Sequence, residues 1–235
     1  MTPFTLPPDY PRIRRVHSFQ ELVSTPFADG VNALCWERAL LGDFREVVER
    51  LGGGEGIVTL DEVRLTSLPV SAAGRVAVEG LLADLRLLRV LEREPVLNCI
   101  HVYPRDEEPG PVATDVFSFH ADSAPVEADT WLCTYHGAPS EGLRNDEAQR
   151  RVDVPATRAE LLKLFGGADG AEFCEFLTEN CYDLHYAASV TARSFSFGQG
   201  NLWRLAVAWP GSLVPPCIHR APKTSPGEAR LLLIS

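Results

Sequence analysis

After Pro95 the chain changes to short runs of β-branched and aromatic residues, each followed by a cluster of turn-forming residues. Runs of this kind predict strands, and their number limits the choice of fold more than any other feature. We expect strands at residues 96–103, 113–120, 130–136, 192–197, 202–209, 214–219 and 229–234. With an earlier apolar run this makes about seven or eight short strands, which is typical of a jelly roll.

The first 95 residues favour helices. Asp43 followed by Glu46 is typical of a capped helix start, and the glycines at 52–54 end that helix. Apolar residues at three- and four-residue steps predict a second helix over residues 72–92. The apolar run at 31–36 is the one short strand expected here. We therefore predict a helical N-terminal layer over residues 1–95 and a jelly-roll core over residues 96–235.

A helical segment interrupts the predicted strands at about residues 156–185. Thr157 and Glu160 predict a capped helix that runs toward Phe165, and a second helical stretch covers 171–184. No stretch is long enough to be an interdomain linker. We therefore expect a single domain, residues 1–235, that is mainly β with α and carries a helical insertion.

Charge and composition exclude some classes of function. The net charge is −10, and no lysine- or arginine-rich run is present, so we do not expect nucleic acid as a partner. The N-terminal residues lack the apolar core of a signal peptide, and no apolar 20-mer predicts a membrane span. We expect a cytoplasmic protein whose six cysteines, which form no C-x-x-C pair, are reduced thiols. The oligomeric state is left open.

His120 and Asp122 form an H-x-D pattern in the predicted strand region. In an extended segment, side chains two residues apart leave the same side of the backbone, so these two can bind one ion. His219 provides a second imidazole further along the chain. Two histidines and one carboxylate are the protein ligands of the facial triad in non-haem Fe(II) enzymes, where three coordination positions stay open.

Arg230 follows His219 after ten intervening residues, and His219 itself begins an H-R-x-P sequence. This ordered pattern resembles the 2-oxoglutarate/Fe(II)-dependent oxygenase superfamily over roughly residues 96–235, without identifying a subfamily. The resemblance implies a distorted, cupin-like double-stranded β-helix in which His120, Asp122 and His219 bind Fe(II). It also implies that Arg230 binds the distal carboxylate of 2-oxoglutarate, the co-substrate that is used together with dioxygen.

The residue type at position 230 suits this role on physical grounds. A guanidinium presents a planar fork of donors that matches a carboxylate, and it stays charged when desolvated. Three leucines follow Arg230 and predict a buried strand, where an unpaired charge is costly. Either a bound anion or a structural ion pair with a protein carboxylate would relieve that cost.

One position departs from the superfamily pattern. A hydroxyl residue often stands two residues after the arginine, whereas this chain has Leu232. The second partner of the carboxylate must then come from another strand. The candidates are Asn98, Tyr103, Thr134 and Tyr135.

The other four histidines lack partners at a recognisable spacing, and we expect them to be surface or hydrogen-bonded residues: His17, His101, His136 and His185. His136 has additional interest because it precedes a glycine-containing loop, residues 137–142, where it could touch substrate.

The function predicted from these residues is an Fe(II)- and 2-oxoglutarate-dependent dioxygenase that acts on a small molecule. A carboxylate at position 122 favours hydroxylation over halogenation, because the halogenating relatives have a small residue there. Two alternatives are left open. One is a cupin-like metalloenzyme that does not use 2-oxoglutarate, and the other is a non-catalytic jelly-roll binding protein.

Overall fold

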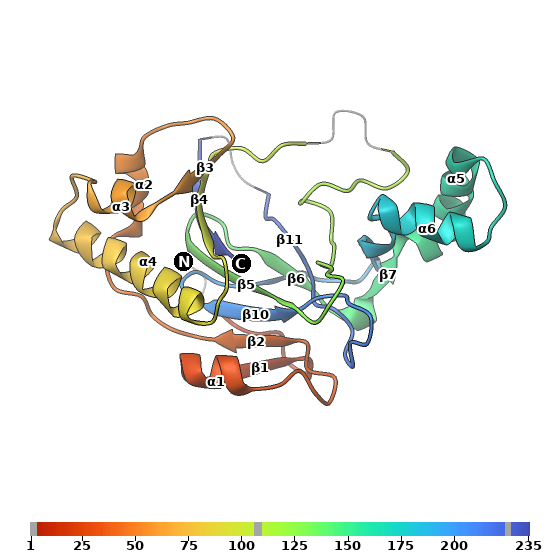
Figure 1. The fold of residues 1–235 in the computed structure, drawn as a ribbon, viewed down its shortest axis with the longest axis horizontal. Coiled ribbons are helices and arrows are strands. Elements are labelled where there is room, and N and C mark those ends of the chain that lie inside the picture. The colour runs from red at the N-terminus through yellow and green to blue at the C-terminus, as the bar shows by residue number, and fades with distance from the viewer. Residues whose placement is uncertain (1–3, 106–109, 224–226) are drawn as a thin grey trace.

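The computed structural model describes residues 4–105, 110–223 and 227–235, and a seven-stranded sheet lies at its centre (Figure 1). All neighbouring strands in this sheet are antiparallel except the parallel pair β1 and β2. Across the sheet the order is β1 (Ile13–Val16), β2 (Ala33–Trp36), β10 (Leu202–Ala206), β5 (Asp129–His136), β12 (Arg230–Ile234), β4 (Val96–Ile100) and β3 (Ile57–Leu60).

A smaller sheet has the order β11 (Ile218–Arg220), β6 (Glu141–Leu143), β9 (Phe195–Ser196). From β5 onward the chain passes repeatedly between this sheet and the large one, with β6 and β9 in the small sheet, β10 in the large, β11 in the small and β12 in the large. One apolar cluster contains side chains from both sheets, including Phe195, Phe197, Trp203, Leu205 and Leu232. The two sheets therefore share a core.

Helices cover the other face of the large sheet. The longest, α4 (Ala72–Val90), is capped by the Ser71 hydroxyl, which accepts a hydrogen bond from the backbone N–H of Gly74. Its buried residues join strand residues in a second apolar cluster; the helix contributes Ala77, Val78, Leu81, Leu82, Leu85 and Leu88. The shorter helices on this side are α1 (Phe19–Ser24), α2 (Phe44–Leu51) and α3 (Glu62–Thr66).

The predicted cap of α2 is confirmed. The Asp43 side chain accepts a hydrogen bond from the N–H of Glu46, and Gly52 ends the helix with φ of 81°. The Glu46 carboxylate does not return this bond. It accepts hydrogen bonds from the backbone N–H and the hydroxyl of Ser71, and so ties α2 to the start of α4.

A buried ion pair connects α4 with the sheet. The guanidinium of Arg38 donates two hydrogen bonds to Asp84, at 2.7 and 2.5 Å, and the hydroxyl of Tyr135 donates a third at 2.6 Å. Asp84 is the only acidic residue among the buried residues of α4. These three contacts satisfy a carboxylate that would otherwise destabilise an apolar layer.

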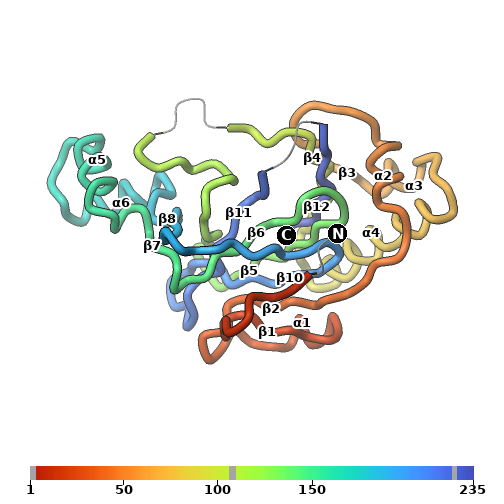
Figure 2. The backbone as a smooth tube through the Cα atoms, turned by 180° about the vertical axis from the view of Figure 1, so that it is seen from behind, coloured from red at the N-terminus to blue at the C-terminus, as the bar shows by residue number. Residues whose placement is uncertain are grey.

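The helical insertion consists of α5 (Pro155–Phe165) and α6 (Ala171–Glu179), and it lies at the opposite end of the molecule from α2–α4 (Figures 1 and 2). Strands β7 (Ala148–Arg150) and β8 (Tyr186–Ala188) pair with each other at its base, next to three short 3-10 helices at 145–147, 151–153 and 182–184. The predicted cap at Thr157 is wrong. The helix begins two residues earlier at Pro155, because a proline at the first helical position has no N–H to leave unsatisfied.

The chain is a mixed α/β protein, with about 30% helix and 24% strand, rather than the mainly β protein that we predicted. Its sheets are large and antiparallel, and they do not close into a barrel. The first 95 residues contribute three strands to the large sheet, β1, β2 and β3, where one short strand was predicted. No helix in the described part of the chain is long and apolar enough to cross a membrane.

The strand predicted at 113–120 does not form. The carboxylate of Asp115 accepts hydrogen bonds from the backbone N–H groups of Phe117 and Ser118, and these local bonds close a turn. Only His120, at the end of this segment, makes bridges to neighbouring strands. The segment is therefore irregular until it reaches the small sheet.

Candidate metal centre

His120, Asp122 and His219 lie together, with one ligand atom of each within 4.8 Å of the others. The backbones of His120 and His219 exchange two hydrogen bonds, each 2.9 Å long, so the two residues are direct cross-strand neighbours. Side chains of such a pair leave the same face of a sheet. The sequence prediction that these three residues lie close together agrees with this geometry.

Backbone carbonyls orient both imidazoles. Nδ1 of His120 lies 2.7 Å from the carbonyl oxygen of Ser118, and Nδ1 of His219 lies 3.4 Å from that of Cys217. A proton on each Nδ1 forms a hydrogen bond to the carbonyl. Each Nε2 then keeps its lone pair and can bind a metal. Nε2 of His219 lies 3.7 Å from Oδ2 of Asp122, which matches donor atoms that face one common point.

The Asp122 carboxylate is held from the neighbouring strand. The Thr130 hydroxyl donates a hydrogen bond of 2.5 Å to Oδ2, and the backbone oxygen of Asp122 accepts one from the N–H of Ala208. The Asp122 side chain is 34% exposed, whereas that of His219 is 8% exposed. The centre is thus fixed on its protein side and reached by solvent at the carboxylate.

The electrostatic environment favours the protonation states that a metal requires. Burial lowers the pKa of His120, and the neighbouring His219 lowers it further. Burial raises the pKa of Asp122, but His219 and the hydrogen bond from Thr130 more than offset it, so the pKa lies below its usual value. At neutral pH the site therefore offers a neutral His120 imidazole and a carboxylate. These donors fit a divalent transition metal with further open positions.

Arg230 is 1% exposed and lies at the start of β12. Its guanidinium donates hydrogen bonds to three hydroxyls: Tyr103 at 2.5 Å, Ser140 at 2.6 Å and Thr134 at 2.9 Å. Its Nε is buried without a hydrogen-bond partner. Burial lowers the pKa of Arg230, and Tyr103 offsets part of that effect.

Among the residues that the structure describes, no carboxylate forms an ion pair with Arg230. The structural ion pair that we considered from the sequence is therefore absent from that part of the chain. Within the described part of the chain, hydroxyl dipoles compensate the buried charge, and the Nε–H group has no acceptor there. The arrangement fits an anion-binding site.

Two of the four predicted carboxylate partners, Tyr103 and Thr134, contact Arg230. The other two do not. Asn98 accepts a hydrogen bond from the Thr59 hydroxyl at the sheet edge. Tyr135 was predicted wrongly, because its ring packs in the helix-side cluster, where it stacks on Phe44 and its hydroxyl binds Asp84.

Ser140 was missed by the sequence analysis, since nothing in its spacing relates it to Arg230. It also links the arginine to the metal centre. The backbone oxygen of Ser140 accepts a hydrogen bond from Phe197, which extends the β6–β9 ladder, and two residues later Gly142 lies opposite His219. Residues two apart in a strand share a face and are separated by about 7 Å. The register therefore places Ser140 and His219 on the same face of the small sheet.

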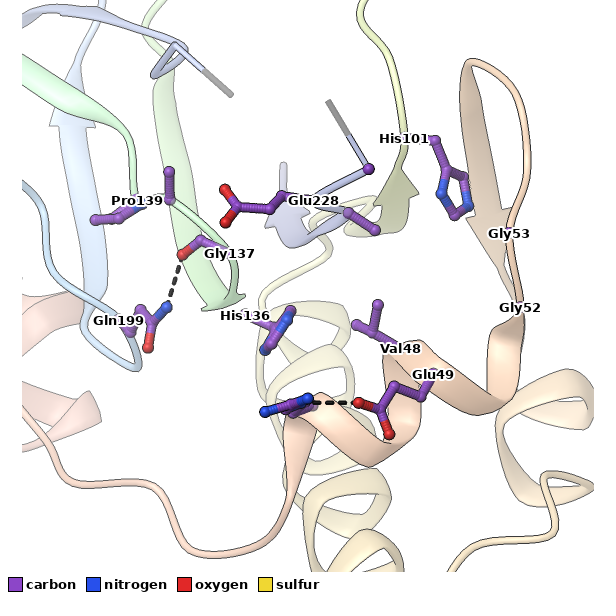
Figure 3. A pocket seen from close by; sticks show the side chains of 14 residues that line it. Val48, Glu49, Gly52, Gly53, His101, His136, Gly137, Pro139, Gln199 and Glu228 are labelled. Atoms are coloured by element: carbon purple, nitrogen blue, oxygen red, sulfur yellow. Dashed lines mark hydrogen bonds and ion pairs between the residues drawn. The ribbon is translucent and has the colours of Figure 1, made fainter. Parts of the chain in front are cut away.

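A separate pocket of about 840 Å³ lies between α2 and the ends of β4, β5 and β12 (Figure 3). His101 and His136 line it, together with Arg45 and Glu49 of α2, which form an ion pair. None of the three metal-centre residues lines this pocket. The prediction that His136 could touch a substrate thus refers to a different cavity from the metal centre.

His185 is a second neighbour of the centre whose position the sequence did not indicate. We expected a surface or hydrogen-bonded histidine that is not a ligand; the surface alternative is wrong, since His185 is 4% exposed and lies beside His120, with 5.7 Å between the ring centroids. His17 is exposed, and Nε2 of His101 lies 3.7 Å from the thiol of Cys99. Spacing carries no signal for His185, because it reaches the centre from the far end of the helical insertion.

No known protein family matches this chain, and comparison with curated proteins and with solved structures finds no match either. The chemistry of the site must therefore be argued from its own residues.

Proposed function

We propose that the protein is an Fe(II)- and 2-oxoglutarate-dependent dioxygenase that hydroxylates a small molecule. The observation that carries the proposal is the buried guanidinium of Arg230, which has no carboxylate partner among the described residues. Its hydrogen bond to Ser140 joins it to the strand that pairs with His219, a member of the metal centre. A metal-chelating 2-oxo acid with a second carboxylate at its far end would satisfy both groups at once.

Arg230 has the donors that such a carboxylate needs. A guanidinium has five N–H groups, and the hydroxyls of Tyr103, Thr134 and Ser140 accept hydrogen bonds from three of them. The three contacts fix the plane of the guanidinium while its Nε stays unpaired. A bound carboxylate compensates the buried charge and the unpaired donor, which makes the site selective for anions.

His120, Asp122 and His219 would hold the metal. When bound, Fe(II) supplies the activation of dioxygen, coupled to the conversion of 2-oxoglutarate to succinate and carbon dioxide. The chain provides two imidazoles oriented by carbonyls and one carboxylate oriented by Thr130. With one anionic ligand, a divalent ion keeps a net positive charge that favours an anionic co-substrate.

The finer description of the fold, a distorted double-stranded β-helix, belongs to the same proposal. The passage of the chain between the large and the small sheet from β5 to β12 supports it, as does the core that the two sheets share. In such a fold the metal site lies between the sheets, where β11 carries His219 and β12 carries Arg230.

Two other functions are consistent with part of the site. A cupin-like metalloenzyme without 2-oxoglutarate would use the metal centre but would give Arg230 and its hydroxyls no role. A non-catalytic binding protein with a structural ion, including Zn²⁺, is consistent with the donor set, since imidazole and carboxylate bind several divalent metals. Arg230 favours the oxygenase over both.

Ligand preference tests the proposal without knowledge of the substrate. The Fe(II) protein is titrated under argon with 2-oxoglutarate and with 2-oxopentanoate, which has a methyl group in place of the distal carboxylate. A charge-assisted hydrogen bond contributes about 1.5–3 kcal/mol, so the wild type should prefer 2-oxoglutarate by about 10- to 100-fold. Arg230→Met should lose this preference while binding Fe(II) normally. Equal binding of the two acids by the wild type would exclude the assignment of Arg230.

A further inference from the structure

Three histidines from distant parts of the chain lie in one row beside the metal centre. His120 is bridged to His219 on one side and to His185 on the other, and both pairings are antiparallel. His185 belongs to the segment by which the helical insertion returns to the sheet, directly after the 3-10 helix Tyr182–Leu184. The row therefore joins the insertion to the proposed metal ligands.

Backbone hydrogen bonds fix the register of this row. The N–H of Ala121 donates to the oxygen of Leu184 at 3.0 Å, and the N–H of Tyr186 donates to the oxygen of Phe119 at 2.8 Å. His120 and His185 are thus opposite each other as a pair without hydrogen bonds between them, the kind of antiparallel pair whose side chains lie closer together. Their side chains share one face, and the rings are tilted by 41°.

The geometry makes His185 a neighbour of a ligand rather than a fourth ligand. His185 and His219 lie on opposite sides of His120, and neighbouring strands are about 4.8 Å apart. An ion held by His120, His219 and Asp122 would bind to donor atoms on the side of His120 that faces His219. Among the described residues, the cluster whose donor atoms lie within 4.8 Å of one another contains those three and not His185.

His185 packs against the ring of His120. The hydrogen bond from Nδ1 to the carbonyl of Ser118 orients the His120 ring at one atom, and packing against neighbouring rings adds a second restraint. The rings of His219, at 4.7 Å, and His185, at 5.7 Å, flank it on its two sides. In this row, His185 is the neighbour of the His120 ring on the side away from His219.

We propose that His185 is a positioning residue of the metal centre, through which the helical insertion sets the orientation of the His120 ring. The inference rests on the proposed metal site and goes beyond it. The helical insertion is then part of the centre, because any change that moves the segment Tyr182–Tyr186 also moves His185, which packs against His120. An aromatic side chain of similar shape at position 185 should serve as well as histidine, since the role depends on ring packing.

Co(II) binding tests this without turnover, because Co(II) accepts the same ligands as Fe(II) and its d–d absorption reports ligand geometry. The apoprotein is titrated with Co(II) alone in the wild type, His185→Ala and His185→Phe, with His17→Ala as a control at an exposed position. Loss of a supporting partner of a ligand costs about 10- to 100-fold in metal affinity. His185→Ala should show such a loss and an altered spectrum, while His185→Phe should resemble the wild type.

Each other outcome overturns the inference in a distinct way. If His185→Ala binds Co(II) as the wild type does, the ring has no positioning role. If His185→Phe loses as much affinity as His185→Ala, a ring nitrogen is needed and His185 is a ligand or a hydrogen-bonding group. Should His185→Ala fail to fold, His185→Leu keeps the volume without the planar ring and takes its place. If the wild type does not bind Co(II), the proposed metal site itself is wrong. Failure of the metal site is therefore distinguishable from failure of the positioning role.

Discussion

His120 and His219 exchange both of their backbone hydrogen bonds, at 2.9 Å each, although one lies in an irregular segment and the other in β11. This pairing places two imidazoles side by side with no flexible loop between them. Since the two backbones are joined by these bonds, the relative positions of the two Cα atoms are set before any ion binds. Such preorganisation lowers the cost of binding a metal with a defined geometry.

Removal of a ligand should abolish metal binding. His219→Ala leaves one imidazole and one carboxylate, so Fe(II) affinity should fall by at least about 100-fold, as measured by anaerobic titration of the apoprotein. His17→Ala and His101→Ala are matched controls and should bind Fe(II) as the wild type does. Retention of wild-type affinity by His219→Ala would refute the metal centre.

Ser140, which accepts a hydrogen bond from Arg230, should affect the binding of 2-oxoglutarate and not that of the metal. Ser140→Ala removes one acceptor from a buried guanidinium, which should cost about 1–3 kcal/mol in binding or in folding free energy. We expect 2-oxoglutarate affinity to fall by about 5- to 100-fold at unchanged Fe(II) affinity. The control is Ser194→Ala, at an exposed position. A drop in Fe(II) affinity alone would show that Ser140 serves the metal centre instead.

Tyr135 should contribute to the stability of the fold but not to the binding of 2-oxoglutarate. Tyr135→Phe removes one of three hydrogen bonds to buried Asp84, at a cost of about 1–3 kcal/mol in the free energy of unfolding. Asp84→Ala leaves Arg38 buried without its partner and should cost about 3–5 kcal/mol. Urea denaturation measures both. The exposed Arg45–Glu49 pair is the control, and Arg45→Ala should change stability little. Weakened 2-oxoglutarate binding in a folded Tyr135→Phe protein would contradict the placement of Tyr135 on the helix side of the sheet.

Acidification should destabilise the protein in part through His136. Burial, together with nearby Arg45, lowers the pKa of His136 below its usual value of 6.5. The unfolded chain then binds more protons than the folded one below about pH 6.5, so stability is lost as the pH falls through that window. Replacement by glutamine should reduce this loss between about pH 7.5 and 5.5, as followed by urea denaturation. An identical pH dependence in His136→Gln would rule out this contribution.

Slow conversion of 2-oxoglutarate should occur without a substrate. The wild type with Fe(II), ascorbate and dioxygen should form succinate at a low rate, because the co-substrate still leaves a position on the metal open. Asp122→Ala should form none, since it removes the one anionic ligand. Candidate small molecules can then be screened for acceleration of the same signal. Absence of 2-oxoglutarate binding and of succinate would favour the cupin-like or non-catalytic alternative.

Local patterns in the sequence were enough to predict several elements. The cap at Asp43, the helix over 72–92 and the strand that became β5 all depend on residues near one another in the chain. The spacing of His120 and Asp122 likewise indicated two groups on one side of the backbone. The three leucines after Arg230 predicted its burial, which is confirmed. In each case the determining interactions act within a few residues.

Tertiary structure decided the rest, because the interactions that matter join distant segments. The run at 113–120 has the composition of a strand, yet Asp115 satisfies its backbone locally. Neighbouring Thr134 and Tyr135 look equally suited to bind an anion, but only Thr134 faces Arg230. Ser140 and His185 reach the site through strand pairing, whose register depends on the whole sheet. Sequence thus identified the three residues of the proposed metal centre, whereas tertiary packing determined which side chains surround them.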